Sequence, residues 1–208
     1  HPTSWWYGKE KSFVTNIASE AVLHLLADGY LDGLVVQGYD AYHKSYQAVW
    51  TYLLDTGARI PGFAETDACF DKKDLLAYDH VFMNYMGKSG ELDSAKIASA
   101  AKEAKTFASS GAFLSLSAEG SVMGERMERR AGETVRIAVE AYPVPGQKKI
   151  SRLDLIGRGG SILAAIEDFP GGTVEFEHKT NSLPDYVIAR SFGENDRIDG
   201  ARQQDVRH

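Results

Sequence analysis

The stretch TVRIAVEAY, residues Thr134–Tyr142, alternates between apolar and polar side chains. Positions 135, 137, 139 and 141 are Val, Ile, Val and Ala, whereas Arg136 and Glu140 lie between them. Successive side chains of a β-strand point to opposite faces of its sheet. The pattern therefore predicts a strand with one buried and one exposed face.

Further short alternating segments lie on both sides of this strand. Their separators, such as EGSVMG, YPVPGQ, FPGG and SLPD, are rich in Gly, Pro and Asp. The other expected strands are Phe113–Ala118, Ile150–Ile156, Ser161–Ile166, Thr173–His178 and Tyr186–Ser191. Short strands with such turns predict a small antiparallel β-sandwich of immunoglobulin-like type over residues 110–208.

Upstream of Ser109 the hydrophobic pattern changes to that of helices alternating with strands. We expect helices over 14–29, 41–57 and 92–107, the last one started by Asp93 or Ser94, and strands over 31–38, 59–65 and 80–86. Strands separated by helices of this length indicate βαβ units and a parallel sheet. The sequence thus predicts an α/β domain over 1–109, followed by the sandwich.

Composition excludes several classes of protein. The net charge of −6 and the absence of a basic stretch argue against nucleic-acid binding. No apolar run approaches the roughly 20 residues that a membrane helix needs. The single cysteine excludes an internal disulfide framework and leaves the compartment open. Because the chain starts with HPTSWWYG, without an initiator Met or a signal peptide, we expect a piece of a longer protein.

The stretch IPGFAETDACFD, Ile60–Asp71, holds the candidate site. Asp67 follows a predicted strand, where α/β folds gather their chemistry, so it can bind a divalent metal or act as an acid or base. It can equally be a solvated loop carboxylate. Cys69 is either a thiolate ligand or a small half-buried apolar residue. The sequence contains no GxSxG, HExxH, CxxC or phosphate-binding glycine loop.

Several motifs occur together in a characteristic order: His1-Pro2, LVVQG, WTYLLDTGARIPG, ETDAC and KTFASSGAF. In this order they resemble the C-terminal part of a polymerase-and-histidinol-phosphatase (PHP) metallohydrolase, of the carbaryl hydrolase-like (CehA/McbA) subgroup. The resemblance covers most of the chain and is strongest from Trp50 to Asp67 and from Lys105 to Phe113.

The resemblance implies the C-terminal half of a distorted (β/α)7 barrel, with divalent zinc or manganese at its strand ends. It also implies a hydrolase that uses metal-activated water on a phosphoester, ester, amide or carbamate bond of a small molecule. By this likeness His1 and Asp67 are metal ligands, and Cys69 stands where the family has its last ligand histidine. The family's early H-x-H pair lies upstream of the HP motif, so we expect the isolated chain to be inactive.

Two further expectations concern partners. The chain is expected to pair with its missing N-terminal half or to form a homodimer through an exposed edge of the α/β sheet. The alternative function is a non-catalytic PHP-like protein whose sandwich binds a polymer or a partner. For the sandwich aromatics, alternation predicts that most face the core; they are Phe113, Tyr142, Phe176, Tyr186 and Phe192.

Overall fold

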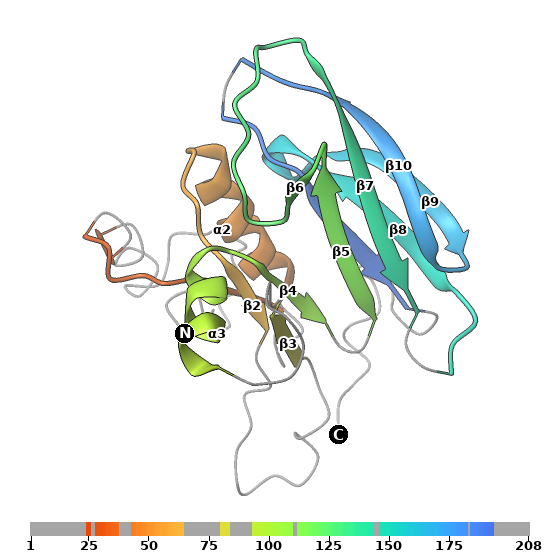
Figure 1. The fold of residues 1–208 in the computed structure, drawn as a ribbon, viewed down its shortest axis with the longest axis horizontal. Helices are drawn as coiled ribbons and strands as arrows, with labels where there is room; N and C mark the ends of the chain where they lie inside the picture. The colour runs from red at the N-terminus through yellow and green to blue at the C-terminus, as the bar shows by residue number, and fades with distance from the viewer. Residues whose placement is uncertain are drawn as a thin grey trace, which may run out of the picture.

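The computed structural model describes residues 24–25, 28–37, 43–64, 80–83, 93–109, 112–143, 146–182 and 184–193. Within these ranges the chain is mostly β, with four small sheets and the α-helices α2 (His43–Asp55) and α3 (Ser94–Lys102) (Figure 1). In the same ranges, the helices are too short or too polar to cross a membrane.

Two antiparallel sheets form the predicted β-sandwich. One has the strand order β10-β7-β5-β6 and the other β11-β8-β9. The first sheet contains β5 (Phe113–Ala118), β6 (Ser121–Val122), β7 (Thr134–Tyr142) and β10 (Gly172–Lys179). The second contains β8 (Ile150–Ile156), β9 (Ile162–Phe169) and β11 (Ile188–Phe192), with a 3₁₀ turn, η2 (Arg158–Gly160), between β8 and β9. The expected antiparallel sandwich is therefore present within the described residues of 112–193.

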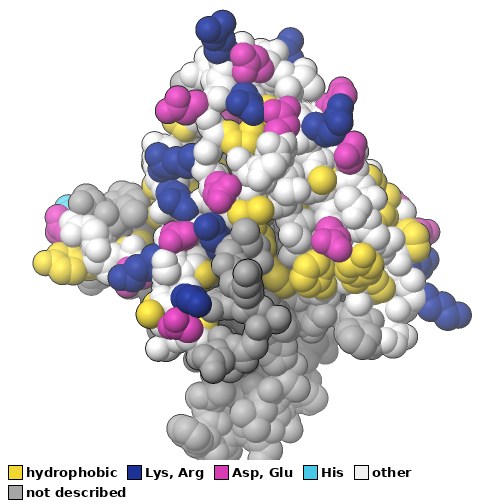
Figure 2. Space-filling model, in the orientation of Figure 1, with side chains coloured by type: hydrophobic (Ala, Val, Ile, Leu, Met, Phe, Trp, Pro, Cys, Tyr) yellow, Lys and Arg dark blue, Asp and Glu magenta, His cyan; other side chains and the backbone are white. Residues whose placement is uncertain are grey.

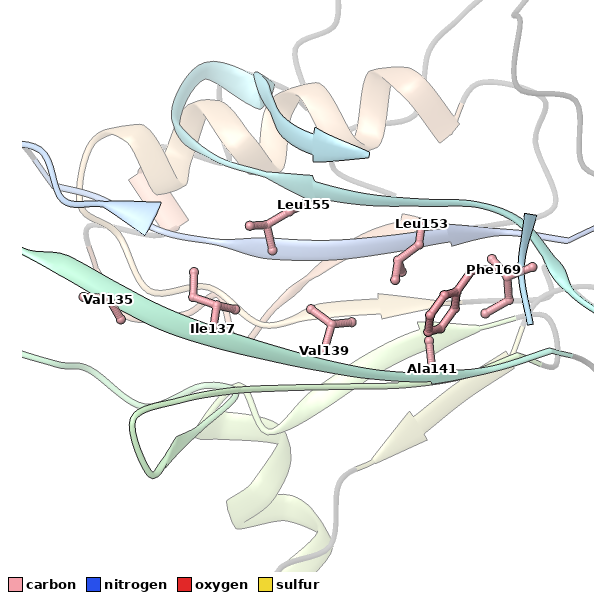
Figure 3. Packing of buried hydrophobic residues seen from close by; sticks show 8 residues of the cluster. Val135, Ile137, Val139, Ala141, Leu153, Leu155 and Phe169 are labelled. Carbon is pink, nitrogen blue, oxygen red and sulfur yellow. The ribbon is translucent and has the colours of Figure 1, made fainter. Parts of the chain in front are cut away.

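The core of the sandwich lies between these two sheets. The alternating side chains of β7 point toward Leu153, Leu155 and Phe169 of the opposite sheet (Figure 3). Val139 and Leu153 have no exposed surface at all. The alternation in TVRIAVEAY thus has the predicted cause, a strand with one face buried against a second sheet.

The structure also contains a hairpin that the alternation did not predict. Strands β5 and β6 pair through Ala118 and Ser121, so the turn between them has two residues. Both turn residues, Glu119 and Gly120, have positive φ, which suits the right-handed twist of a tight hairpin. Strand β6 lies within EGSVMG and has only two residues, too few to show an alternating pattern in the sequence.

A β-α-β unit precedes the sandwich, as predicted. Strands β1 (Leu34–Gln37) and β2 (Gly62–Ala64) pair in parallel, and α2 connects them. Leu34, Leu53 and Ile60 form the buried core of this unit. It is much smaller than the core of the sandwich.

The third helix ends earlier than its sequence pattern predicts. Asp93 caps its N-terminus and accepts a hydrogen bond from the Ala95 amide at 2.9 Å. At the other end the Lys105 amide donates to the Ala100 carbonyl, and Ala104 adopts φ 57, which is a Schellman stop formed without glycine. The expected helix over 92–107 is therefore wrong beyond Lys102.

Strand β4 (Thr106–Ser109) follows this stop. It pairs antiparallel with β3 (His80–Met83) and lies beside β2, where the Thr106 hydroxyl donates to the Gly62 carbonyl at 3.1 Å. The expectation of a parallel sheet is thus confirmed for β1 and β2 and wrong for β3. The Schellman turn, which no glycine marks, allows this reversal of the chain.

Candidate functional site

The three predicted metal ligands, His1, Asp67 and Cys69, lie outside the described residues. What the structure does describe is the strand before two of them. Strand β2 ends at Ala64, three positions ahead of Asp67 in the sequence. Because β1 and β2 run in parallel, with Leu34 opposite Gly62 and Gln37 opposite Ala64, both strands end at the same edge.

Specific contacts fix β2 in this position. The Trp50 indole donates to the Ile60 carbonyl at 2.7 Å, which ties α2 to the start of the strand. At Gly62 a Cβ atom would lie 3.0 Å from the Val36 side chain and 3.3 Å from the Trp50 ring. Glycine therefore allows helix and strands to pack closely, and the motif W-x-x-L-L-D-x-G-x-R-I-P-G has a structural role here.

A polar joint connects the end of α2 to the turn between β8 and β9. Asp55 accepts a hydrogen bond from the Gly159 amide through its carboxylate at 2.9 Å. The Arg158 guanidinium donates to the Asp55 carbonyl at 2.9 Å and to the Pro184 carbonyl at 2.7 Å. A single arginine thus joins the helix, the η2 turn and the segment before β11. We call these contacts the α2 joint.

Tyr186 lies at the same joint. Its hydroxyl donates to the Thr51 carbonyl over a long 3.5 Å. Burial raises the pKa of Tyr186 to about 12, and the nearby Asp55 carboxylate adds to the effect while the Gly160 amide opposes it. The phenol therefore stays neutral here over the whole physiological pH range.

A buried carboxylate lies on the outer face of the second sheet. Asp154 is 1% exposed and accepts from Arg152 Nε at 2.6 Å and from Arg190 Nη2 at 2.8 Å. Arg190 also donates to Gln47 of α2 at 3.3 Å, and its Nε atom is buried without a partner in the described chain. This arginine–aspartate ladder connects the sandwich to α2 and satisfies a charge that would be costly to bury alone.

A second joint connects the C-terminus of α3 to the sandwich. The Lys105 ammonium lies 2.9 Å from Glu103 and 3.8 Å from Glu125, the latter just after β6. The hydrogen bond from Lys105 lowers the pKa of the Glu103 carboxyl. At Gly124 a Cβ atom would come within 2.4 Å of the Glu103 carbonyl oxygen, so only glycine fits.

His178, near the end of β10, pairs with an aspartate of the loop that follows. It is buried, and its Nε2 lies 2.8 Å from the Asp185 carboxylate. Burial raises the pKa of Asp185, but hydrogen bonds from His178 and Asn181 outweigh burial, so the net pKa shift is downward. The pair closes the loop between β10 and β11. Across the described ranges no three His, Cys, Asp or Glu side chains gather to form a metal site.

Two aromatic side chains of the sandwich face solvent rather than the core. Phe113 and Tyr142 are 44% and 46% exposed, with ring centroids 6.1 Å apart, and Phe107 of β4 packs edge-on against Phe113. The expectation of inward-facing rings is wrong for these two and confirmed for Phe176, which packs against the core. We call Phe107, Phe113 and Tyr142 the aromatic end.

The opposite end of the same sheet is polar. There a shallow hollow of roughly 480 Å³ is lined by Glu119, Arg136, Glu175 and Glu177, together with small residues. On the face drawn in Figure 2, charged side chains of both signs spread over the upper sandwich, and hydrophobic ones gather near its lower end.

Comparison with known proteins gives no relative for this chain. No protein-family model, no curated protein and no solved structure matches it.

Sequence reasoning missed the residues that hold the two parts together: Asp55, Arg152, Asp154, Arg158 and Arg190. One signal was present in ISRLDLI, where Asp154 stands between two leucines and two positions after an arginine. A carboxylate in so apolar a strand needs a cation nearby. The partners themselves are distant in sequence, and no local pattern points to them.

Proposed function

We propose that this chain is the C-terminal part of a metal-dependent hydrolase that cleaves a phosphoester, ester, amide or carbamate bond of a small molecule. In this proposal β1, α2 and β2 belong to a partial PHP-like (β/α)7 barrel. The sandwich, of immunoglobulin-like type, packs against that barrel through the α2 joint.

One observation supports the proposal above the others. The parallel β1–α2–β2 unit ends both of its strands at one edge, and the D-x-C sequence with Asp67 and Cys69 follows β2 within a few residues of the chain. The carboxyl ends of parallel strands are where α/β proteins place their catalytic groups. The long-range bonds of the α2 joint agree with a sandwich that serves to hold the barrel.

The proposed ligand set fits zinc better than manganese. An imidazole (His1), a carboxylate (Asp67) and a thiolate (Cys69) are all zinc ligands, whereas manganese prefers oxygen and nitrogen donors. Bound zinc would supply acidified water and stabilise negative charge that develops on the substrate. The contribution of this chain is to hold these donors at the edge of a strand that Trp50 and Gly62 fix in place.

The test is an activity screen of the longer protein that contains this chain. Model phosphoesters, esters, amides and carbamates are assayed with zinc and with manganese. We expect Asp67→Asn to lower kcat/KM by at least about a hundredfold, since loss of a ligand exceeds the effect of losing an outer-shell partner. Asp28→Asn, at an exposed turn, serves as the matched control and is expected to have full activity.

Two outcomes would refute the proposal. One is a longer protein that is inactive on all four bond types with both metals. The other is full activity in Asp67→Asn. The chain by itself is expected to show little turnover, so metal analysis of the isolated chain adds a separate check: one tightly held metal per chain would contradict the ligand count.

The aromatic end favours a second function, non-catalytic binding of a polymer or partner by the sandwich. Exposed, adjacent Phe113 and Tyr142 rings present an apolar surface of the kind that binds sugars or protein side chains. Tyr142→Ala would then abolish retention on a polysaccharide or glycan array, and Tyr52→Ala, at an exposed position of α2, would not. Equal retention of both variants would exclude this function for the aromatic end.

A further inference from the structure

Strand β9 forms an open edge of the sandwich. It is the last strand in the order β11-β8-β9, and within the described chain no strand pairs with its outer side. In Figure 1 the labelled end of β9 lies at the right of the sandwich, on the side away from α2. The strand has eight residues, ILAAIEDF, and no proline. A long open edge of this kind is a template for another strand.

The charges that usually protect such an edge are neutralised here. Glu167 lies 3.2 Å from Arg152, and Asp168 pairs with Lys149. Both acidic residues are at one end of β9, and the remaining edge is uncharged. At the other end Ile162 is 50% exposed and Leu163 is 41% exposed. Lysine or proline at an edge would prevent pairing, and β9 has neither.

The two faces of β9 can be assigned from burial. Ala164 and Ile166 pack against the sandwich core, whereas Leu163, Ala165 and Glu167 are exposed on the outer face. When two copies pair antiparallel about a two-fold axis perpendicular to the sheet, opposite residues must lie on the same face. Only registers that place an outer residue opposite an outer residue satisfy this condition.

We propose that β9 pairs antiparallel with β9 of a second copy of this chain, centred on Ala165, so that the two three-stranded sheets become one continuous sheet. In this register Ala165 lies opposite Ala165 of the partner subunit, and Leu163 lies opposite the partner's Glu167. No like charges oppose each other, and two methyl groups meet at the axis. A second copy fits this edge because the register places the acidic end of each strand, Glu167 and Asp168, opposite the uncharged end of the other, Ile162 and Leu163. This edge differs from the α/β edge expected from the sequence, and the proposal is independent of the hydrolase function.

The oligomeric state tests the proposal. Light scattering on the purified chain is expected to give twice the monomer mass of 22.8 kDa. Ala165→Lys places two lysines opposite each other at the axis and is expected to raise the dissociation constant more than about tenfold. Thr173→Lys makes the same charge change at an exposed position of β10, the edge of the other sheet, and is expected to stay dimeric. A monomeric wild type, an unaffected Ala165→Lys, or equal loss in both variants would overturn the proposal.

Cysteine cross-linking tests the register without relying on a destabilising charge. In a Cys69→Ser background, Ala165→Cys is expected to form a disulfide-linked dimer under mild oxidation, because this position lies opposite itself. Leu163→Cys lies opposite position 167 and is expected to stay unlinked. Cross-linking of Leu163→Cys instead, or of neither variant, would rule out this pairing even when both proteins are folded.

Discussion

The sandwich and the β1–α2–β2 unit differ in how each is held together. In the described chain, eight buried residues form the sandwich core, and three form the core of the β-α-β unit. The smaller unit compensates with polar contacts to the larger one: the α2 joint and the arginine–aspartate ladder. The sandwich is therefore the stable body, and the β-α-β unit depends on its attachment.

The largest expected effect on stability comes from shortening one buried leucine in each of the two cores and comparing the two variants. Leu153→Ala removes a fully buried side chain between two sheets and is expected to lower the free energy of unfolding by about 3–4 kcal/mol. Leu53→Ala, in the smaller core, is expected to cost about 2–3 kcal/mol, since that site can collapse more easily. Urea unfolding measures both values.

Hydrogen exchange then shows whether the sandwich and the β-α-β unit unfold independently. Leu53→Ala is expected to increase exchange in α2 and β2 and to leave β7 and β8 protected. Leu153→Ala is expected to increase exchange everywhere, because the attached unit loses its support. Equal, global exchange in both variants would mean that the two parts unfold as one.

A second, smaller effect is expected at the arginine–aspartate ladder. Asp154→Asn keeps the shape but removes the charge that accepts from Arg152 and Arg190, at a cost of about 2 kcal/mol. The matched control is Glu167→Gln on the neighbouring strand, where the carboxylate is largely exposed; there the expected change is within about 0.5 kcal/mol. Thermal unfolding of both variants checks the difference, and equal stability of the two would show that Asp154 does little for the fold.

The α2 joint gives a still smaller and more local effect. Arg158→Ala removes both hydrogen bonds to backbone carbonyls and is expected to cost about 1–2 kcal/mol. Faster exchange is expected in the last turn of α2 but not in β7. Arg126→Ala, at an exposed loop position, is the control and is expected to be neutral. Unchanged exchange in α2 would show that other contacts hold the helix.

The sequence predicted the sandwich well because its signal is local. Alternation in strands such as Thr134–Tyr142 reports directly which face is buried, and Gly- and Pro-rich turns mark the ends. The stop of α3 could not be predicted, because Ala104 adopts the left-handed conformation in which glycine is usual. The β3–β4 pairing followed from that stop and was missed with it.

The candidate site was likewise predicted only where its signal is local in the sequence. The strand leading to Asp67 and the helix before it were predicted from local pattern. The contacts between Asp55 and Arg158, and between Gln47 and Arg190, join residues more than 100 positions apart. No periodicity in one segment encodes such a partner. For Phe113 and Tyr142, the predicted strands are correct but the predicted faces are not. Both residues are next to core-facing neighbours, Leu114 on β5 and Ala141 on β7, so strict alternation places their rings on the outer face of the sheet.

The smallest expected effect is a pH dependence at the α2 joint. Tyr186 has its pKa raised by burial from the ordinary value of 10.0 to about 12. A raised pKa means that the folded state holds the proton more tightly than the unfolded state. The resulting stabilisation is complete below about pH 10 and is lost as the pH rises toward 12. Tyr186→Phe cannot ionise, so its stability is expected to fall less than that of the wild type over this window.

Tyr52→Phe, at an exposed position of α2, is the matched control and is expected to follow the wild type. Urea midpoints measured across the alkaline range compare the three proteins. Parallel loss of stability in all three proteins would show that burial at the joint does not raise the pKa of Tyr186. A flatter profile in Tyr186→Phe alone would show that the joint between the β-α-β unit and the sandwich excludes water from this side chain. The sandwich would then shield from water the α2 joint, through which it stabilises the β-α-β unit.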